Sequence, residues 1–229
     1  PLGLQFSVLA IGIIVMQGAV VRFDIAENGI MVPGTPAQNG FSAANKLINF
    51  LMALYNGLAS AILGFNAQNY GKSDYRRIRQ GTRQSLIIML IMYAFCLTAG
   101  LLLSIGGAYQ HIFMSEDKIS EASVRFGNTY LYVDFILYFI LGFLIVTRSA
   151  VQGITKVGYV LGAGVAELVS RVLICAYLPA LVNGGATDAS ASLASFAAVC
   201  FGDPGAWLLA SLVLLVPTVK YIFRMQYKK

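Results

Sequence analysis

Charged residues are scarce in this chain. Only 11% of its 229 residues are Asp, Glu, Lys or Arg, whereas 58% are hydrophobic. Soluble domains carry about 25% charged residues, so this chain has too little polar surface to cover a water-soluble globule of its size. The composition argues against a secreted disulfide scaffold, a disordered tail and an ordinary cytosolic enzyme. It favours an integral membrane protein.

Residue types that carry catalysis are also scarce. His111 is the only histidine, which rules out a zinc site with two His ligands, and the sequence offers no recognisable Ser–His–Asp set. The three cysteines, Cys96, Cys175 and Cys200, lie in or beside apolar stretches without metal or disulfide spacing, so we expect small buried residues. There is no phosphate loop, and no basic groove accompanies the aromatic residues. We therefore expect no enzymatic activity, no metal, no cofactor and no nucleic-acid partner.

Long runs without charge mark the expected membrane spans. A spanning helix needs about 20 apolar residues, and continuous runs favour helices over the alternating strands of a barrel. The expected spans are approximately 1–21, 43–70, 84–109, 128–150, 157–181 and 204–223. The fold class is therefore an all-α membrane protein with a bundle of six transmembrane helices. The first run begins at Pro1 without a basic n-region or cleavage site, so we expect a span cut from a longer protein rather than a signal peptide.

Basic residues alternate between the expected loops. Eleven of the sixteen Lys and Arg residues fall near the second-to-third loop, the fourth-to-fifth loop and the tail: Lys72, Arg76, Arg77, Arg79, Arg83, Arg148, Lys156, Lys220, Arg224, Lys228 and Lys229. The positive-inside rule then places both chain ends in the cytoplasm. We expect the protein itself to lie in the plasma membrane. The two longer segments, 22–40 and 182–203, are expected as outer loops without a domain of their own.

Glu167 and Arg171 lie four residues apart in an otherwise apolar span and therefore share one helix face. A charge at mid-membrane costs about 2.5–3.5 kcal/mol on insertion scales, so the pair should face protein or water. One interpretation is a structural ion pair, and this is the expected one. The other is a proton or cation relay, or a gate that opens when the pair separates.

Further polar residues fall in or beside the spans. Asn45 and Lys46 begin the second, where Lys46 either snorkels to the interface, as expected, or lines a pathway. Asp134 in the fourth is expected at the interface, with a pathway role as the alternative. Gln17 lies deep in the first span, and Gln17, Asn45 and Gln152 are further candidates for a substrate or coupling pathway. Amides and glycines at the inner ends of the second and fourth spans are expected to fix helix packing: Gln68, Asn69, Gly71, Gln152 and Gly153.

Several of these residues belong to short motifs that follow one another along the chain in a characteristic order. The motifs, in chain order, are Pro1-Leu2-Gly3-Leu4-Gln5-Phe6-Ser7, Ala43-Ala44-Asn45-Lys46, Gln68-Asn69-Tyr70-Gly71-Lys72, Tyr75-Arg76-Arg77-Ile78-Arg79-Gln80-Gly81, Arg148-Ser149-Ala150-Val151-Gln152-Gly153, Glu167-Leu168-Val169-Ser170-Arg171 and Pro204-Gly205-Ala206-Trp207. In this order and spacing the chain resembles the C-terminal half of a multidrug and toxic compound extrusion (MATE) transporter.

The resemblance implies one lobe of a two-lobed exporter that opens alternately to either side of the membrane. Its partners would be the N-terminal lobe, membrane lipid and small amphipathic organic cations, which are exchanged for protons or sodium ions. One branch of the family places acidic cation ligands in the first and fourth helices of this lobe. This chain instead has Ser7 and Leu9 near the first position and Leu141 near the second.

Coupling needs a titratable or ligating group whose affinity differs between the two open states. Within this chain Glu167 is the first candidate and Asp134 the second. Our hypothesis is that Glu167 and Arg171 hold the geometry of the lobe, while coupling resides mostly in the other lobe. One alternative function is a flippase for lipid-linked oligosaccharides, which would need a more cationic cavity than Lys46 and Arg171 provide. Another is a membrane assembly subunit without transport activity.

Overall fold

The computed structural model describes the backbone of residues 2–224 and the side chains of residues 10–224. Its α-helices are α1 (Leu2–Val21), α2 (Pro36–Gly71), α3 (Tyr75–Ser104), α4 (Ala108–Phe113), α5 (Glu121–Gly153), α6 (Val157–Asn183), α7 (Leu193–Cys200) and α8 (Gly202–Thr218). Short 3₁₀ turns occupy Arg22–Asp24, Ile105–Gly107 and Glu116–Lys118, and a π-helical turn occupies Val219–Phe223. The described part contains no β-strand, only an isolated bridge between Ile25 and Met31.

The long helices are apolar enough to cross a membrane. By length and composition, five segments of the described residues qualify: Pro36–Gly71, Tyr75–Phe113, Glu121–Gly153, Val157–Asn183 and Leu193–Phe223. The sixth long helix, α1, has 20 residues and no charged side chain. The expected all-α bundle is confirmed. Several helices extend beyond the charge-free runs, because at 1.5 Å per residue the 36 residues of α2 reach well past a hydrocarbon core of about 30 Å.

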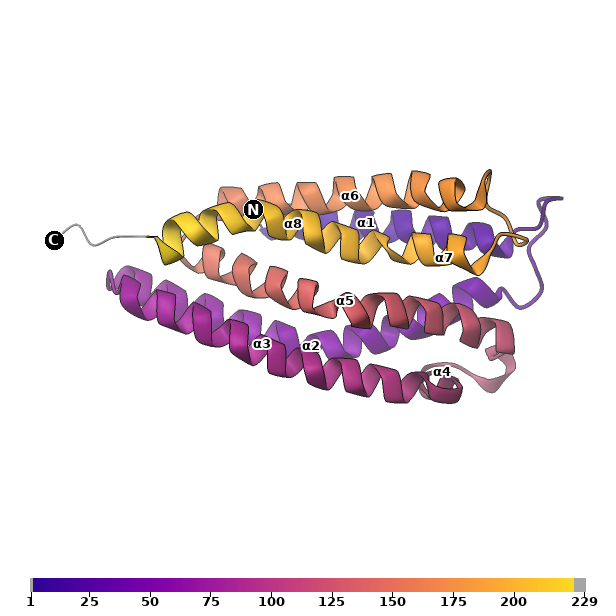
Figure 1. The fold of residues 1–229 in the computed structure, drawn as a ribbon, viewed down its shortest axis with the longest axis horizontal. Helices are drawn as coiled ribbons and strands as arrows, with labels where there is room; N and C mark the ends of the chain where they lie inside the picture. Colours follow the sequence, from indigo (N-terminus) through magenta and orange to yellow (C-terminus); the bar gives the residue numbers. More distant parts are fainter. Residues whose placement is uncertain (1, 225–229) are drawn as a thin grey trace.

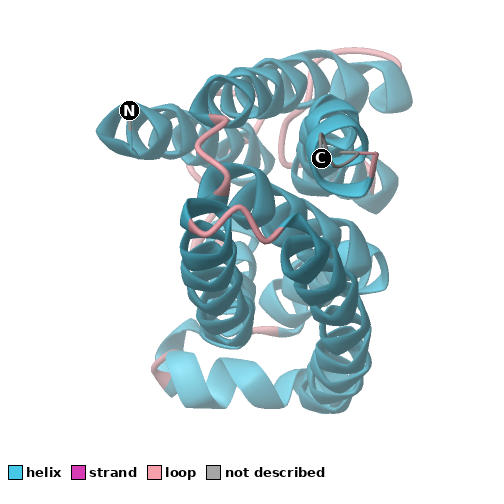
Figure 2. Ribbon diagram, turned by 90° about the vertical axis from the view of Figure 1, so that its left-hand side faces the viewer, coloured by secondary structure: helices cyan, strands magenta, loops and turns pink. Residues whose placement is uncertain are grey.

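The helices form two groups with α5 between them. In Figure 1, α1, α6, α7 and α8 lie above α5, whereas α2 and α3 lie below it. Helix α5 packs against α2 and α3 on one side and against α8 on the other, and α6 packs against both α1 and α8. Figure 2 views the bundle from one end and shows the long helices running roughly along the line of sight, whereas the short α4 lies across them at the bottom.

An aromatic cluster holds the two groups together at the middle of the bundle. The ring of Tyr138 on α5 lies 5.2 Å from that of Tyr55 on α2 and 6.1 Å from that of Trp207 on α8, between centroids. Tyr55 and Tyr138 are fully buried. Edge-to-face aromatic pairs are worth about 0.5–1.5 kcal/mol each beyond their buried area. The cluster therefore fixes α5 relative to both groups.

Gly153 lets α5 approach α2 closely. A Cβ atom at this position would lie 2.8 Å from Asn66 Cβ and 2.9 Å from the carbonyl oxygen of Leu63, both on α2. Asn66 itself is buried and donates hydrogen bonds from its amide to the Thr82 hydroxyl and to the carbonyl oxygen of Ala150. Gly153, which was expected to fix helix packing, thus lies where α5 and α2 cross.

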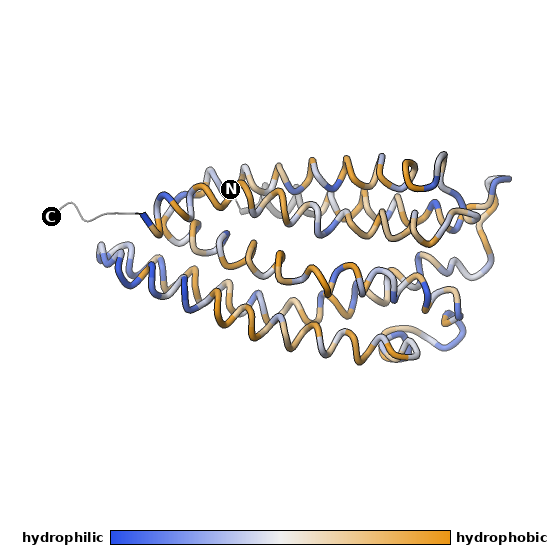
Figure 3. Tube along the Cα trace, in the orientation of Figure 1, coloured by the Kyte–Doolittle hydropathy of each residue, from blue (hydrophilic) through white to orange (hydrophobic). Residues whose placement is uncertain are grey.

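The arginines after α2 belong to a helix and not to a loop. The expected loop is limited to Lys72–Asp74, and α3 already begins at Tyr75. Asp74 caps this helix by accepting a hydrogen bond from the Arg77 N–H at 3.0 Å. The charge-free pattern missed this extension because exposed arginines are good helix formers outside the hydrocarbon region. Figure 3 shows the hydrophilic end of α2 and α3 beyond their apolar stretches.

The segment 182–203 was expected as a loop, and this is wrong for much of its length. Helix α6 continues to Asn183 and α7 begins at Leu193. The Ser192 hydroxyl accepts a hydrogen bond from the Ser195 N–H at 3.2 Å, which is an N-cap. In the remaining loop the N–H and hydroxyl of Ser190 donate to Asp188 and lower the pKa of that carboxyl.

The long segment 22–40 is organised by a single buried carboxylate. Asp24 is fully buried, and its two oxygens accept hydrogen bonds from the N–H groups of Ala37 and Gln38, both at 2.9 Å. Thr35 precedes α2 with a positive φ of 38° and makes no side-chain cap. Asp24 therefore caps the N-terminus of α2 from 13 residues away. The expected loop is in part helical, because α2 begins at Pro36.

Candidate functional site

A central cavity opens between the two helix groups. Its volume is about 390 Å³, within the range of about 300–1,000 Å³ typical of small-molecule sites. It is lined by Ile13 and Met16 of α1, by Phe41, Asn45, Ile48, Asn49, Met52, Asn56, Ala59, Ser60 and Leu63 of α2, by Tyr130, Asp134, Leu141, Leu144, Ile145, Arg148, Ser149 and Gln152 of α5, by Glu167 and Arg171 of α6, and by Asp203 and Trp207 of α8.

Four charged residues in the cavity wall form one continuous chain. Arg148 Nη2 lies 2.5 Å from Glu167 Oε2, and Glu167 Oε1 lies 3.7 Å from Arg171 Nη2. The same Arg171 nitrogen lies 2.6 Å from Asp203 Oδ1. The chain thus runs from α5 through α6 to α8. Because it joins three helices by charge-assisted contacts, it fixes α5 relative to α6 and α8.

The charged chain extends to Tyr130. The hydroxyl of this buried tyrosine donates to Asp203 Oδ2 at 2.8 Å. Asp203 therefore receives hydrogen bonds from α5 and α6 on its two oxygens, and it lies in the first turn of α8, where the helix dipole favours a negative charge. These contacts compensate the cost of burying the carboxylate.

Glycines on α1 and α8 make room for the Arg171 and Cys175 side chains. A Cβ atom at Gly12 of α1 would lie 2.6 Å from Arg171 Nη1 and 3.3 Å from its Cδ. At Gly202 of α8, a Cβ atom would lie 3.7 Å from Arg171 Cγ and 2.7 Å from Cys175 Sγ. The backbones of α1 and α8 thus pack directly on the arginine, which explains how it is 4% exposed in a bundle of apolar helices.

The expected pairing of Glu167 with Arg171 is only part of this arrangement. Their 3.7 Å contact is the longest of the chain, and each residue has a closer partner on another helix. Sequence reasoning missed both partners because Arg148 was assigned to a basic end and Asp203 to an acidic loop. The expected cavity cations, Lys46 and Arg171, also left out Arg148, which lies within α5 and lines the cavity.

Asp134 is the carboxylate in the cavity wall that lacks a partner. It was expected at the membrane interface, but it is fully buried and lines the cavity near the middle of α5. Within the described part of the chain, neither of its carboxylate oxygens has a hydrogen-bond partner. Tyr130, one turn earlier, directs its hydroxyl to Asp203 instead.

The polar wall contributed by α2 is made of amides. Asn45 lines the cavity as the pathway interpretation requires, and Asn49 donates from its side-chain amide to the backbone and side-chain oxygens of Asn45, both at 2.9 Å. Asn56, about two turns after Asn49, lines the cavity as well. Gln152 faces the same space from α5. The cavity therefore combines apolar surface with amide donors and acceptors.

Several predicted residues lie elsewhere. Gln17 is exposed on α1 and does not line the cavity. Lys46 is exposed and donates to the carbonyl oxygen of Phe113 at 3.0 Å, away from the cavity wall. Gln68 is exposed as well. A pathway role for these three side chains finds no support in the geometry.

The motif that closes α2 behaves as a helix end. Asn69 donates from its amide to the Phe65 carbonyl oxygen at 2.7 Å within the same helix, rather than across helices. Gly71 is exposed, and no atom lies within 4 Å of a Cβ placed there. Neither observation shows the cross-helix packing expected at this motif, in contrast to Gly153.

The remaining predictions concern ligand sites. Cys96, Cys175 and Cys200 are free and buried, as expected. Among the described residues no group of three or more His, Cys, Asp or Glu side chains could hold a metal ion. Leu141 lines the cavity and offers no ligand there. The side chains of Ser7 and Leu9 lie outside the described residues.

Among the comparisons with known proteins, a protein-family model matches the chain. The MatE family model matches residues 31–177, which is more than half of the chain and includes α2 to α5 and most of α6. No curated protein and no solved structure matches the chain. The matched part supplies most of the cavity wall, including Asp134, Arg148, Glu167 and Arg171.

Proposed function

Since the chain belongs to the MATE family of membrane transporters, we propose that it forms the C-terminal lobe of a secondary exporter of amphipathic organic cations. The N-terminal lobe of the same transporter would supply the facing wall of the cavity. Export would be driven by the inward movement of protons or sodium ions. We place the protein in the plasma membrane, with the basic end of the bundle and both chain ends in the cytoplasm.

The observation that carries this proposal is the charge balance of the cavity. The cations Arg148 and Arg171 are matched by Glu167 and Asp203 within the charged chain. Asp134 is the remaining carboxylate of the wall, and it has no such partner in the described part. When ionised, it leaves the cavity with one uncompensated negative charge beside apolar surface. That combination suits an amphipathic cation.

Asp134 also gives the exchange a physical basis. A proton or a sodium ion neutralises the same carboxylate that attracts the substrate, so the two ligands compete for one charge. Competition of this kind makes binding of one ligand favour release of the other. In this lobe the coupling role therefore passes from Glu167, which is held by two arginines, to Asp134. The charged chain from Arg148 to Asp203 keeps a structural role.

The two alternative functions are less well supported. A flippase for pyrophosphate-linked lipids needs free positive charge, but Arg148 and Arg171 each contact a carboxylate. An assembly subunit without transport activity needs no open cavity, whereas about 390 Å³ lies between the two helix groups. The geometry thus favours an exporter.

Efflux of a fluorescent cationic dye tests the proposal in cells that carry the full-length gene. We expect efflux with the wild type, loss on adding a proton uncoupler or on removing sodium, and a reduction of at least about tenfold in Asp134→Asn. Asp117→Asn, which alters an exposed carboxylate outside the cavity, is the matched control. Wild-type efflux by Asp134→Asn would contradict the proposal. A Glu167→Gln variant that folds normally but loses all cation-driven export would overturn the structural role of Glu167.

A further inference from the structure

A second hollow lies far from the central cavity, at the C-terminal end of α8. This basic groove is lined by Leu215, Val216, Val219, Lys220 and Arg224 and has a volume of about 570 Å³. Its apolar wall is exposed, with Leu215 at 43% and Val216 at 59% of their full accessible areas. The cations Lys220 and Arg224 follow these apolar residues directly along the chain. The groove therefore changes from apolar to basic along its length.

The basic groove is shaped by the π-helical turn Val219–Phe223 that follows Pro217. Proline cannot donate a backbone hydrogen bond, so the regular pattern is interrupted there. The turn closes with a bond from the Arg224 N–H to the Val219 carbonyl oxygen at 2.8 Å. Lys220 lies in this turn and Arg224 directly follows it, and both line the groove. π-Helical turns are frequent at functional sites.

Two ammonium groups share one aromatic ring beside the groove. The Nζ atoms of Lys156 and Lys220 lie 4.9 Å and 5.1 Å from the centroid of the Tyr221 ring. Such contacts hold like charges close together. None of the ion pairs found in residues 10–224 involves Lys156, Lys220 or Arg224. The cluster therefore carries positive charge that a bound anion would neutralise.

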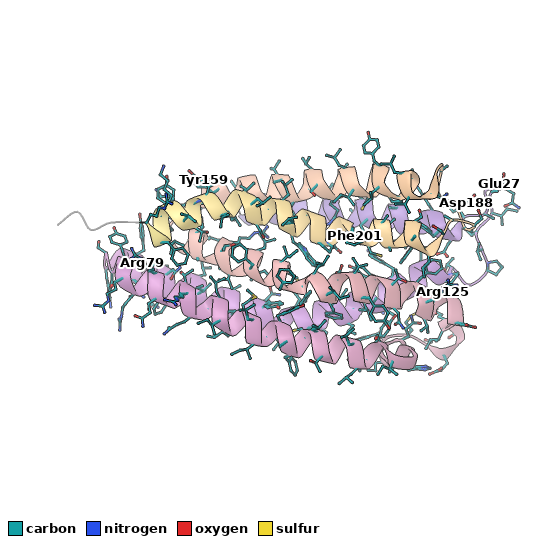
Figure 4. The ribbon with its side chains drawn as sticks, viewed as in Figure 1. Glu27, Arg79, Arg125, Tyr159, Asp188 and Phe201 are labelled. Carbon is teal, nitrogen blue, oxygen red and sulfur yellow. The ribbon has the colours of Figure 1, made fainter. Side chains whose placement is uncertain are left out.

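The surroundings of the groove are those of a membrane interface. Tyr159 of α6 packs against Tyr221, with ring centroids 6.0 Å apart, and tyrosines are enriched where membrane meets water. Arg79 of α3 lies 3.5 Å from the Ile222 carbonyl oxygen. Figure 4 shows Arg79 and Tyr159 at the same end of the bundle, opposite Glu27, Arg125 and Asp188.

We propose that the basic groove binds an anionic phospholipid. The phosphate contacts Lys220 and Arg224, and an acyl chain lies along Leu215, Val216 and Val219. Basic residues at the cytoplasmic end of membrane helices attract anionic headgroups, and the exposed apolar wall distinguishes a lipid from a free anion. The lipid would cover this end of α8. This site is separate from the central cavity, and its test does not depend on transport.

The test uses the full-length transporter purified in detergent and native mass spectrometry with dioleoyl phosphatidylglycerol or dioleoyl phosphatidylcholine. We expect the wild type to retain phosphatidylglycerol preferentially and the double variant Lys220→Gln/Arg224→Gln to bind it about tenfold more weakly. The charge-conserving variant Lys220→Arg/Arg224→Lys should keep the preference. Lys118→Gln/Arg125→Gln removes two exposed cations outside the groove and is the control.

Three results would overturn this inference. One is equal retention of the two lipids by the wild type. Another is unchanged phosphatidylglycerol binding by Lys220→Gln/Arg224→Gln, or an equal loss in the control variant. The third is displacement of the bound lipid by millimolar inorganic phosphate, which would make the basic groove a site for a soluble anion. Misfolding does not obscure the result, because the charge-conserving variant alters the same exposed positions.

Discussion

The guanidinium of Arg171 lies 2.6 Å from the carboxylate of Asp203, and this contact joins α6 to α8 across 32 residues of sequence. Both side chains are buried. Removal of one partner leaves a buried charge without compensation, whereas removal of both does not. The contribution of this ion pair to the stability of the bundle can therefore be measured by substituting its two residues.

We predict that Arg171→Met and Asp203→Leu each destabilise the purified full-length protein by about 3–5 kcal/mol. The double variant should be markedly more stable than the sum of the two effects implies, because no buried charge is left over from this pair. Thermal unfolding in detergent, analysed as a double-mutant cycle, measures this coupling. Simple additivity of the two single variants would contradict a direct ion pair.

Gly12 and Gly18 on α1 offer a matched comparison. A Cβ atom at Gly12 would lie 2.6 Å from Arg171 Nη1, whereas no atom lies within 4 Å of one at Gly18. Arg171 cannot give way freely because Asp203 holds it. We predict that Gly12→Ala lowers stability by about 1–3 kcal/mol through overpacking. Gly18→Ala should leave the melting temperature unchanged or raise it, and equal behaviour of the two variants would contradict the close packing of α1 on Arg171.

Asp24 provides a test of the long segment before α2. Its carboxylate accepts hydrogen bonds from the Ala37 and Gln38 N–H groups. We predict that Asp24→Ala costs about 1–2 kcal/mol of stability through loss of the helix cap. Hydrogen exchange of the first turn of α2 should also become faster than in the wild type. Asp188→Ala, which removes a carboxylate from an exposed loop, is the control and should leave this exchange unchanged.

The sequence was sufficient to predict the spans but not the contacts between them. Runs without charge identify apolar helices because each helix must bury its backbone polar groups by itself. The positions of Glu167 and Arg171 on one helix face also follow from local spacing. Their closer partners could not be found in this way, since Arg148 precedes Glu167 by 19 residues and Asp203 follows Arg171 by 32. Only the packing of α5, α6 and α8 brings them together.

Other differences have local causes that composition does not reveal. The cap from Asp24 to α2 bridges a segment rich in glycine and proline, which reads as a simple loop. Helix α7 has only eight residues, yet its Phe196 and Val199 are fully buried and stabilise it by packing rather than by helix propensity. Asp134 was placed at the interface because a single charge in a span usually lies there. Helix α5 begins at Glu121, however, so Asp134 lies well inside it.

The most direct test of the account is competition for Asp134. The affinity of a fluorescent organic cation for the purified full-length transporter should be measured against proton and sodium concentration in the wild type and in Asp134→Asn. We predict that one of these ions weakens binding to the wild type, and that Asp134→Asn binds the dye at least about tenfold more weakly with that ion dependence abolished. Wild-type affinity in Asp134→Asn, with its dependence on the ion intact, would contradict the account.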